Sequence, residues 1–243
     1  MADMNAAADL LEDLWRQGKT LPRLPDELTP RDVEAALGVQ AAYLKRHRSC
    51  GWKIGPGPGG EGRMAAPLRG DILHAPQQLP AAATPAIEVE VGLVLGSDLP
   101  AGSTAEQAAA AIGGWHLALE PLRSRYDDPK AQPLPVLLAD NLSNAGLILG
   151  SGMPGLSGYV VDIVMELHNG AEKIGEYRGQ ISVPEIAQSL AWLADYAAAR
   201  GRPLAARDVV ITGARIGPVA LQRGASYRAT STIGEAAFGV AQG

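Results

Sequence analysis

Two glutamates, Glu88 and Glu90, interrupt an otherwise aliphatic run over residues 87–95. The alternation of side chains along a β-strand places both carboxylates on one face, about 7 Å apart along the strand. Two like charges on a partly buried face are costly unless a cation or a proton compensates them. The pair therefore indicates a cation site or, as the alternative, the solvent-exposed face of a half-buried strand.

A third glutamate, Glu120, ends a second strand-like run in which His116, Ala118 and Glu120 share one face. If the two runs are neighbouring strands, three carboxylates converge. Three oxygen ligands without a Cys/His cluster favour Mg²⁺ or Mn²⁺ over zinc. His116 is either a further ligand or, more commonly for such a residue, a hydrogen-bonded core histidine.

One lysine, Lys53, stands in the short apolar run 51–55, which begins and ends with glycine. A lysine in such a strand is expected to point into solvent. If it faces the carboxylates instead, its ammonium group is a candidate for transferring a proton or holding an oxyanion.

Other catalytic motifs are absent from the sequence or weak. The Gly/Pro-rich segment 55–60 lacks the Gly-Lys-Ser/Thr ending of a phosphate loop, and its prolines carry no amide donor. No Gly-x-Ser-x-Gly elbow occurs, and Cys50 has no evident base partner in the sequence. Nucleotide binding and nucleophilic catalysis are therefore unsupported.

The elements that must position these residues change character along the chain. Apolar spacing over residues 10–15 predicts one helix, and Thr29 as N-cap followed by Pro30 predicts the start of a second. Short strands are expected later, at residues 87–95, 115–122, 159–167, 173–177, 209–212 and 226–232. Helices followed by many short strands indicate an α+β fold with a curled β-sheet core.

Two local signals refine the second half of the chain. Asn169-Gly170 predicts a tight turn that joins two of the strands into a hairpin. Ser182, three residues before Glu185, predicts the start of a helix that ends near Gly201.

The composition excludes several classes of protein. The chain has 243 residues, of which 47% are hydrophobic and 19% charged, and its net charge is -5. The short basic patch 45–48 is too small for general nucleic-acid binding, and no apolar run reaches the roughly 18 to 20 residues that span a bilayer. The acidic residues Asp3 and Asp9 argue against a signal peptide, and a single cysteine, Cys50, fits a cytoplasmic protein.

Six segments, in this order, resemble the 2-keto-4-pentenoate hydratase / 4-oxalocrotonate decarboxylase family of the fumarylacetoacetate hydrolase-like superfamily. Gly-Trp-Lys-Ile-Gly at 51–55 is similar to the family's Gly-Tyr-Lys-Ile-Gly. The family's Glu-Ala-Glu strand, its Ala-Leu-Glu…Ser-Arg segment and its Ala-Asp-Asn stretch resemble residues 88–90, 118–125 and 139–141. A helix at 184–193 and a Thr-Gly strand at 211–213 complete the series.

The resemblance implies a fold and a site. We expect an N-terminal helical region, residues 1–50, and a fumarylacetoacetate hydrolase-like catalytic domain, residues 51–243, in one continuous structural unit. Mg²⁺ or Mn²⁺ would be held by Glu88, Glu90 and Glu120, with Lys53 as the catalytic side chain. The substrate-binding residues expected around them are Arg123, Arg125, Asp140 and Asn141.

The implied activity is that of a metal-dependent lyase, a hydratase or decarboxylase, which acts on a small 2-oxoacid through an enolate stabilised by a Lewis acid. A homo-oligomer is the expected assembly, with neither nucleic acid nor membrane as a partner. Arg123 replaces a family aspartate, and Asn144 and Ala214 replace family serines. Two alternatives therefore stay open: an acylpyruvate C–C bond hydrolase using Glu61 and His74, and a catalytically silent homologue.

One question concerns the direction of Arg123. Because it is three residues after Glu120, Arg123 faces away from the carboxylates in an unbroken strand, unless Pro121 breaks the strand. If it turned toward the site, it would favour a substrate with two carboxylates.

Overall fold

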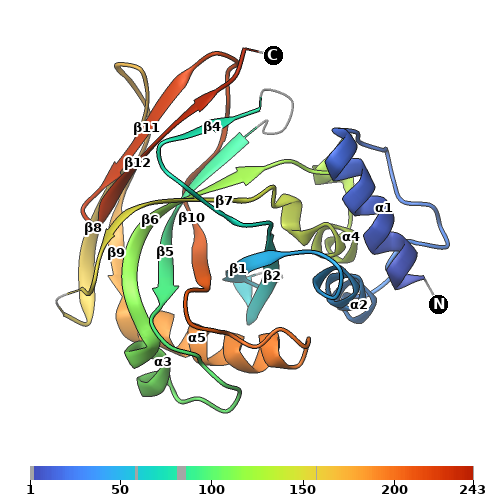
Figure 1. Ribbon diagram of the computed structural model, residues 1–243, viewed down its shortest axis with the longest axis horizontal. Coiled ribbons are helices and arrows are strands. Elements are labelled where there is room, and N and C mark those ends of the chain that lie inside the picture. Colours follow the sequence, from blue (N-terminus) through green and yellow to red (C-terminus); the bar gives the residue numbers. More distant parts are fainter. Residues whose placement is uncertain (1–2, 58–59, 81–85, 157, 243) are drawn as a thin grey trace.

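The computed structural model describes residues 3–57, 60–80, 86–156 and 158–242. They form an α+β fold in which curled sheets are flanked by helices (Figure 1), as the sequence predicts. Within these ranges no helix combines the length and the apolar character that a membrane crossing requires.

The helices are few and lie mostly at the margins of the sheets (Figure 1). They are α1 (Met4–Gln17), α2 (Val33–Leu44), α3 (Ala105–Ala111), α4 (Leu134–Ala139) and α5 (Val183–Ala198), with short 3-10 turns η2 (Pro129–Ala131) and η3 (Asn141–Ser143). The strands are β1 (Ser49–Pro56), β2 (Arg63–Arg69), β3 (Ile72–His74), β4 (Gln77–Leu79), β5 (Ala86–Leu95), β6 (Ile112–Leu122), β7 (Leu147–Met153), β8 (Val160–Asn169), β9 (Glu172–Ser182), β10 (Val209–Ala220), β11 (Ser226–Ser231) and β12 (Gly234–Val240).

Two sheets organise the described strands. A seven-stranded mixed sheet has the order β2-β1-β10-β5-β6-β7-β3, and a five-stranded sheet has the order β4-β12-β11-β8-β9. The main apolar core contains residues from both sheets and from α5, including Val89, Val91 and Leu93 of β5. The alternate residues of β5 face the other side of the seven-stranded sheet, which is where the glutamates lie.

The helical region packs against the rest of the chain through a second apolar cluster. This cluster joins α1 and α2 to the segment around Tyr126 and to α4. The buried ion pair between Glu12 of α1 and Arg69 of β2 adds a polar contact between the two regions. The boundary between residues 50 and 51 stays a prediction.

The second helix begins later than the sequence indicates. Asp32, not Thr29, is its N-cap: the Asp32 carboxylate accepts a hydrogen bond of 2.8 Å from the Ala35 N–H. The Thr29 hydroxyl instead donates to the Pro25 carbonyl, at 2.9 Å. The charged Asp32 side chain, next to the first residue of the helix, therefore caps it in place of the Thr29 hydroxyl three residues earlier.

The predicted hairpin and final helix are confirmed. β8 and β9 pair antiparallel on either side of Gly170, which has φ 56. The Ser182 side chain accepts a hydrogen bond from the Glu185 N–H and caps α5.

Candidate metal centre

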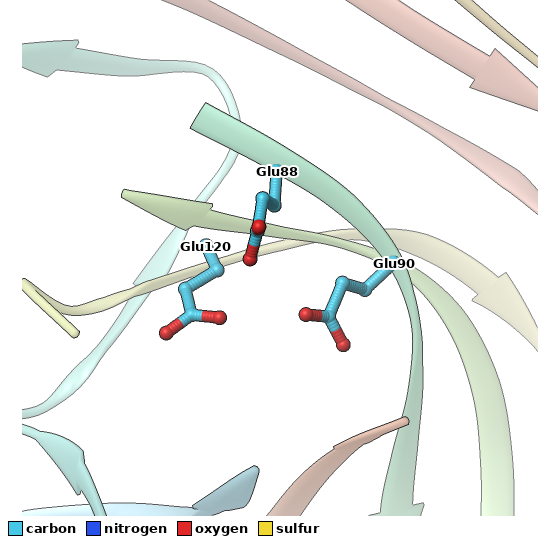
Figure 2. Close-up of side chains that lie close together, drawn as sticks. All are labelled: Glu88, Glu90 and Glu120. Carbon is cyan, nitrogen blue, oxygen red and sulfur yellow. The ribbon is translucent and has the colours of Figure 1, made fainter. Parts of the chain in front are cut away.

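Neighbouring strands bring the three glutamates together. In the antiparallel pair β5–β6, Glu88 lies directly opposite Glu120, and Glu90 lies opposite Ala118. One carboxylate oxygen from each of Glu88, Glu90 and Glu120 lies within 4.8 Å of the others, and Figure 2 shows the three side chains directed toward one space. Glu120 is 0% exposed and Glu90 is 1% exposed, which excludes the solvent-facing alternative for these two residues.

Lys53 faces the glutamates rather than solvent. Its Nζ donates to both carboxylate oxygens of Glu120, at 2.7 Å each, and its side chain is 13% exposed. The residues on either side, Trp52 and Ile54, lie in the main core, so alternation turns Lys53 to the opposite face of the sheet.

The curl of the sheet makes this contact possible. Lys53 is on β1, and two strands, β10 and β5, separate β1 from the Glu120 strand β6. In a flat sheet three strand spacings would separate the two backbones by about 14 Å, at about 4.8 Å for each spacing. The 2.7 Å contact between Nζ and the carboxylate therefore depends on how strongly the sheet bends across β10 and β5.

A bulge in β10 supplies a backbone donor to Glu90. The register between β10 and β5 shifts between Ile211 and Ala214, which leaves the Gly213 N–H free of the ladder. This N–H donates to Glu90 Oε2 at 2.7 Å. Gly213 has φ 95, in the left-handed region that favours glycine. A residue with a Cβ would therefore be strained at this position.

The electrostatics of the cluster favour a cation. Burial and the neighbouring charges of Glu120 and Glu88 raise the pKa of Glu90 well above its usual value, although Lys53 and the Gly213 N–H oppose the shift. Burial also raises the pKa of Glu88. Burial alone would lower the pKa of Lys53, but the charges of Glu120, Glu90 and Glu88 outweigh it and raise that pKa.

Asn144 belongs to the site, although the sequence analysis places it only among the departures from the family. Its Nδ2 donates to Glu120 Oε1 at 2.8 Å, and the residue is 0% exposed. One feature of the sequence points to Asn144: it replaces a family serine close to the Ala-Asp-Asn motif.

Arg125 and Asp140 form a fully buried ion pair. Both are 0% exposed, and Arg125 Nε donates to Asp140 Oδ1. The Arg125 guanidinium also donates to three backbone carbonyls, those of Arg123, Asp140 and Asn144. Neither side chain has a surface that a substrate can touch in this structure.

Because the pair is buried, we expect the change Arg125→Met to destabilise the protein by about 3–5 kcal/mol, the usual effect of leaving one charge of such a pair uncompensated. Urea unfolding monitored by circular dichroism measures this. The double variant Arg125→Met/Asp140→Asn should lose less than the sum of the two single losses. A loss below about 1 kcal/mol for Arg125→Met would contradict the structural role.

Arg123, Asn141 and His116 lie outside the cluster of Glu88, Glu90 and Glu120. Arg123 faces α1, where its Nη2 donates to the Leu14 carbonyl at 3.4 Å. β6 continues through Pro121, so alternation holds and Arg123 turns away from the glutamates. Asn141 is 0% exposed, and its side-chain amide has no hydrogen-bond partner among the described residues. His116 lies within hydrogen-bond distance of the Gly150 carbonyl, 3.1 Å from its Nδ1, and is not part of the carboxylate cluster.

Residues 62–241 match the model of the fumarylacetoacetate (FAA) hydrolase C-terminal family. The chain belongs to this family. A relative, 2-keto-4-pentenoate hydratase 2 of Dechloromonas aromatica, is 31% identical over an alignment of 252 positions, gaps included, which covers 91% of each protein.

Two solved structures show the same fold. The 4-oxalocrotonate decarboxylase from Pseudomonas putida G7, complexed with magnesium and adipate, has a TM-score of 0.82 at 19% identity and covers 98% of this chain and 97% of its own. The fumarylpyruvate hydrolase from Pseudomonas aeruginosa, in complex with Mn2+ and pyruvate, has a TM-score of 0.58 at 17% identity and covers 81% of this chain and 91% of its own. The fold class predicted from the sequence, an FAA hydrolase-like curled mixed sheet preceded by helices, is thus confirmed.

Proposed function

We propose that this member of the FAA hydrolase family is a divalent-metal-dependent lyase that acts on a small 2-oxoacid, as a hydratase or a decarboxylase. The observation that carries this proposal is the charge of the buried site. Three carboxylates and one ammonium group leave a net charge of -2 when all four are ionised, and a divalent cation balances it. The relatives named hydratase and decarboxylase support the same reaction class.

The donor set fits Mg²⁺ or Mn²⁺. Glu88, Glu90 and Glu120 would hold the ion through hard carboxylate oxygens, the ligands that both ions prefer. When bound, such an ion supplies Lewis-acid stabilisation of negative charge on a substrate oxygen. The Gly213 N–H orients Glu90, and the Lys53 ammonium group in contact with Glu120 offsets part of the negative charge of the cluster.

Lys53 is the proposed acid–base residue. Its Nζ lies at the carboxylate cluster, in hydrogen-bond contact with Glu120 and partly open to the site. From this position the ammonium group can hold a developing oxyanion or deliver a proton to the carbon skeleton of an enolate. The charges of Glu120, Glu90 and Glu88 raise the pKa of Lys53, which favours its protonated form.

The hydrolase alternative has less support in the geometry. The superfamily resemblance implies that acylpyruvate hydrolysis uses a His–Glu pair, and Glu61 and His74 are the candidates that the sequence offers. Both are exposed, Glu61 precedes β2 and His74 ends β3, and among the described residues no hydrogen bond or ion pair joins them. The fold similarity to a fumarylpyruvate hydrolase keeps this reaction in the test.

Turnover assays decide among the three reactions. The purified protein with Mg²⁺ or Mn²⁺ is offered 2-hydroxypenta-2,4-dienoate, 4-oxalocrotonate and an acylpyruvate, with EDTA-treated protein as the control. We expect metal-dependent conversion of the first or the second. Conversion of the acylpyruvate alone would establish the hydrolase, and metal binding without any turnover would establish a silent homologue.

We also propose that the protein forms a homo-oligomer. Tyr159, 80% exposed, and Val160, 55% exposed, place neighbouring apolar side chains on the surface at the start of β8. Contact with a second copy would remove them from water. Light scattering after size-exclusion chromatography measures the mass in solution, and a monomeric mass would contradict this proposal.

A further inference from the structure

Three successive residues beside the carboxylates adopt an unusual backbone conformation. Asn141, Leu142 and Ser143 have φ values of 50, 52 and 64. The left-handed region is unfavourable for residues with a Cβ, and runs of it are rare. Backbone strain of this kind persists only where the surrounding structure holds it, and it concentrates at functional sites.

The buried Arg125–Asp140 pair holds this turn at both ends. Arg125 Nη2 donates to the Asp140 carbonyl, just before the turn, and Nη1 donates to the Asn144 carbonyl, just after it, at 3.0 Å. The turn is also joined to the residue that follows β6, because the Arg123 N–H donates to the Ser143 carbonyl at 2.8 Å. Its end, Asn144, therefore has a fixed backbone position.

The side chain of Asn144 has one possible orientation. Its Oδ1 accepts a hydrogen bond of 2.8 Å from the Arg69 N–H, which can only donate. Nδ2 must then face the other way, where it donates to Glu120 Oε1 at 2.8 Å and to the Gly146 carbonyl at 3.0 Å. A flipped amide would place Nδ2 against the Arg69 N–H and Oδ1 against two acceptors, so the surroundings determine the assignment.

This donor makes the two oxygens of Glu120 unequal. Oε1 accepts from both Lys53 and Asn144, whereas Oε2 accepts from Lys53 alone. A carboxylate oxygen has about two lone-pair sites, so Oε1 is saturated and Oε2 retains capacity for a cation.

We infer that Asn144 is a positioning residue for the metal centre: held by the left-handed turn and the Arg125–Asp140 pair, it fixes Glu120 so that Oε2 is the metal-binding oxygen. This inference rests on the proposed function. It assigns to a buried side chain an effect on metal affinity that acts through Glu120.

The test compares Mn²⁺ binding in two variants with a matched control. Asn144→Leu removes the donor to Glu120 at similar volume, and Asn144→Ala removes it in a smaller side chain if the leucine variant does not fold. Gln40→Leu is the control. Gln40 of α2 is also 0% exposed, and its side-chain amide donates to the backbone carbonyl of Leu138 in α4. Calorimetry gives the Kd for Mn²⁺, and electron paramagnetic resonance reports the symmetry of the bound ion.

We expect the Kd for Mn²⁺ to rise about 10- to 100-fold in the Asn144 variant, with an altered resonance spectrum, the usual result of losing a group that orients a metal ligand. Gln40→Leu should keep the wild-type Kd and spectrum. A folded Asn144 variant with the wild-type Kd and spectrum, or with the same Kd and spectrum as Gln40→Leu, overturns this inference and leaves the proposed function standing. Wild-type protein that binds no Mn²⁺ overturns the proposed function and the inference together.

Discussion

Replacing Lys53 with methionine will lower turnover of the best substrate by about 100-fold or more while Mn²⁺ binds as tightly as in the wild type, or more tightly. The loss of turnover follows from removing a positioned acid–base group, for which this magnitude is usual. The metal should bind no less tightly, because the cluster loses the ammonium group that contacts Glu120 and becomes more negative. Steady-state kinetics and calorimetry on the same preparation measure both effects.

A surface lysine provides the control for this variant. Lys173 also pairs with carboxylates, those of Glu166 and Glu176, but on the exposed hairpin β8–β9. Lys173→Met should leave both turnover and Mn²⁺ affinity unchanged. If Lys53→Met retains near-normal turnover, the lysine only neutralises charge and the acid–base role is wrong.

The second large effect is expected at Glu90. Glu90→Gln keeps the shape of the side chain and removes one of three ligand charges, so the Kd for Mn²⁺ and Mg²⁺ should rise by about 100-fold or more, at or beyond the upper range for residues that only orient a ligand. Turnover at low metal concentration should fall in parallel. Calorimetry with each ion is the direct measurement.

Glu166→Gln, a change in a partly exposed glutamate of β8 outside the cluster, serves as the comparison. It should bind both ions as the wild type does. Unchanged Mg²⁺ and Mn²⁺ affinity in Glu90→Gln would refute the metal centre. The Kd for Mn²⁺ should stay the same or fall in Lys53→Met and rise in Glu90→Gln. This difference separates loss of a catalytic group from loss of a metal ligand.

The three glutamates could be predicted from the sequence because a strand has a period of two. That period places Glu88 and Glu90 on one face, and it orients Glu120 in the same way on the next strand. Only their pairing had to be supplied, and it comes from the antiparallel pairing of β5 with β6, the next strand along the chain. The local pattern therefore contained nearly all the information that this part of the site requires.

The direction of Lys53 could not be decided in the same way. Alternation leaves a lysine on one of two faces, and which face is interior depends on the curvature of a sheet whose neighbouring strands come from distant parts of the chain. The pairing of β1 with β10, which joins Lys53 to Ile211, is an example. The family resemblance indicated the correct face, and residue spacing alone did not.

The supporting residues were the hardest to predict. Arg125, Asp140 and Asn141 appear in two recognisable motifs, but the left-handed turn beside them includes Leu142 and Ser143, which strongly prefer other conformations. A sequence pattern with no glycine at these positions gives no sign of such a turn. The expected substrate contact of Asn141 stays a prediction.

The distance between Lys53, the proposed acid, and the proposed metal ligands depends on strand β10, because the seven-stranded sheet curves between them. Three register irregularities in β10 lie between the strand of Lys53 and the strand of Glu88 and Glu90. A substitution there, such as one at Gly213, would change the reach of Lys53 without altering any reacting side chain. Members of the family with the same four ionisable residues can therefore differ in rate or reaction through the backbone of one strand, which a comparison of active-site side chains would not detect.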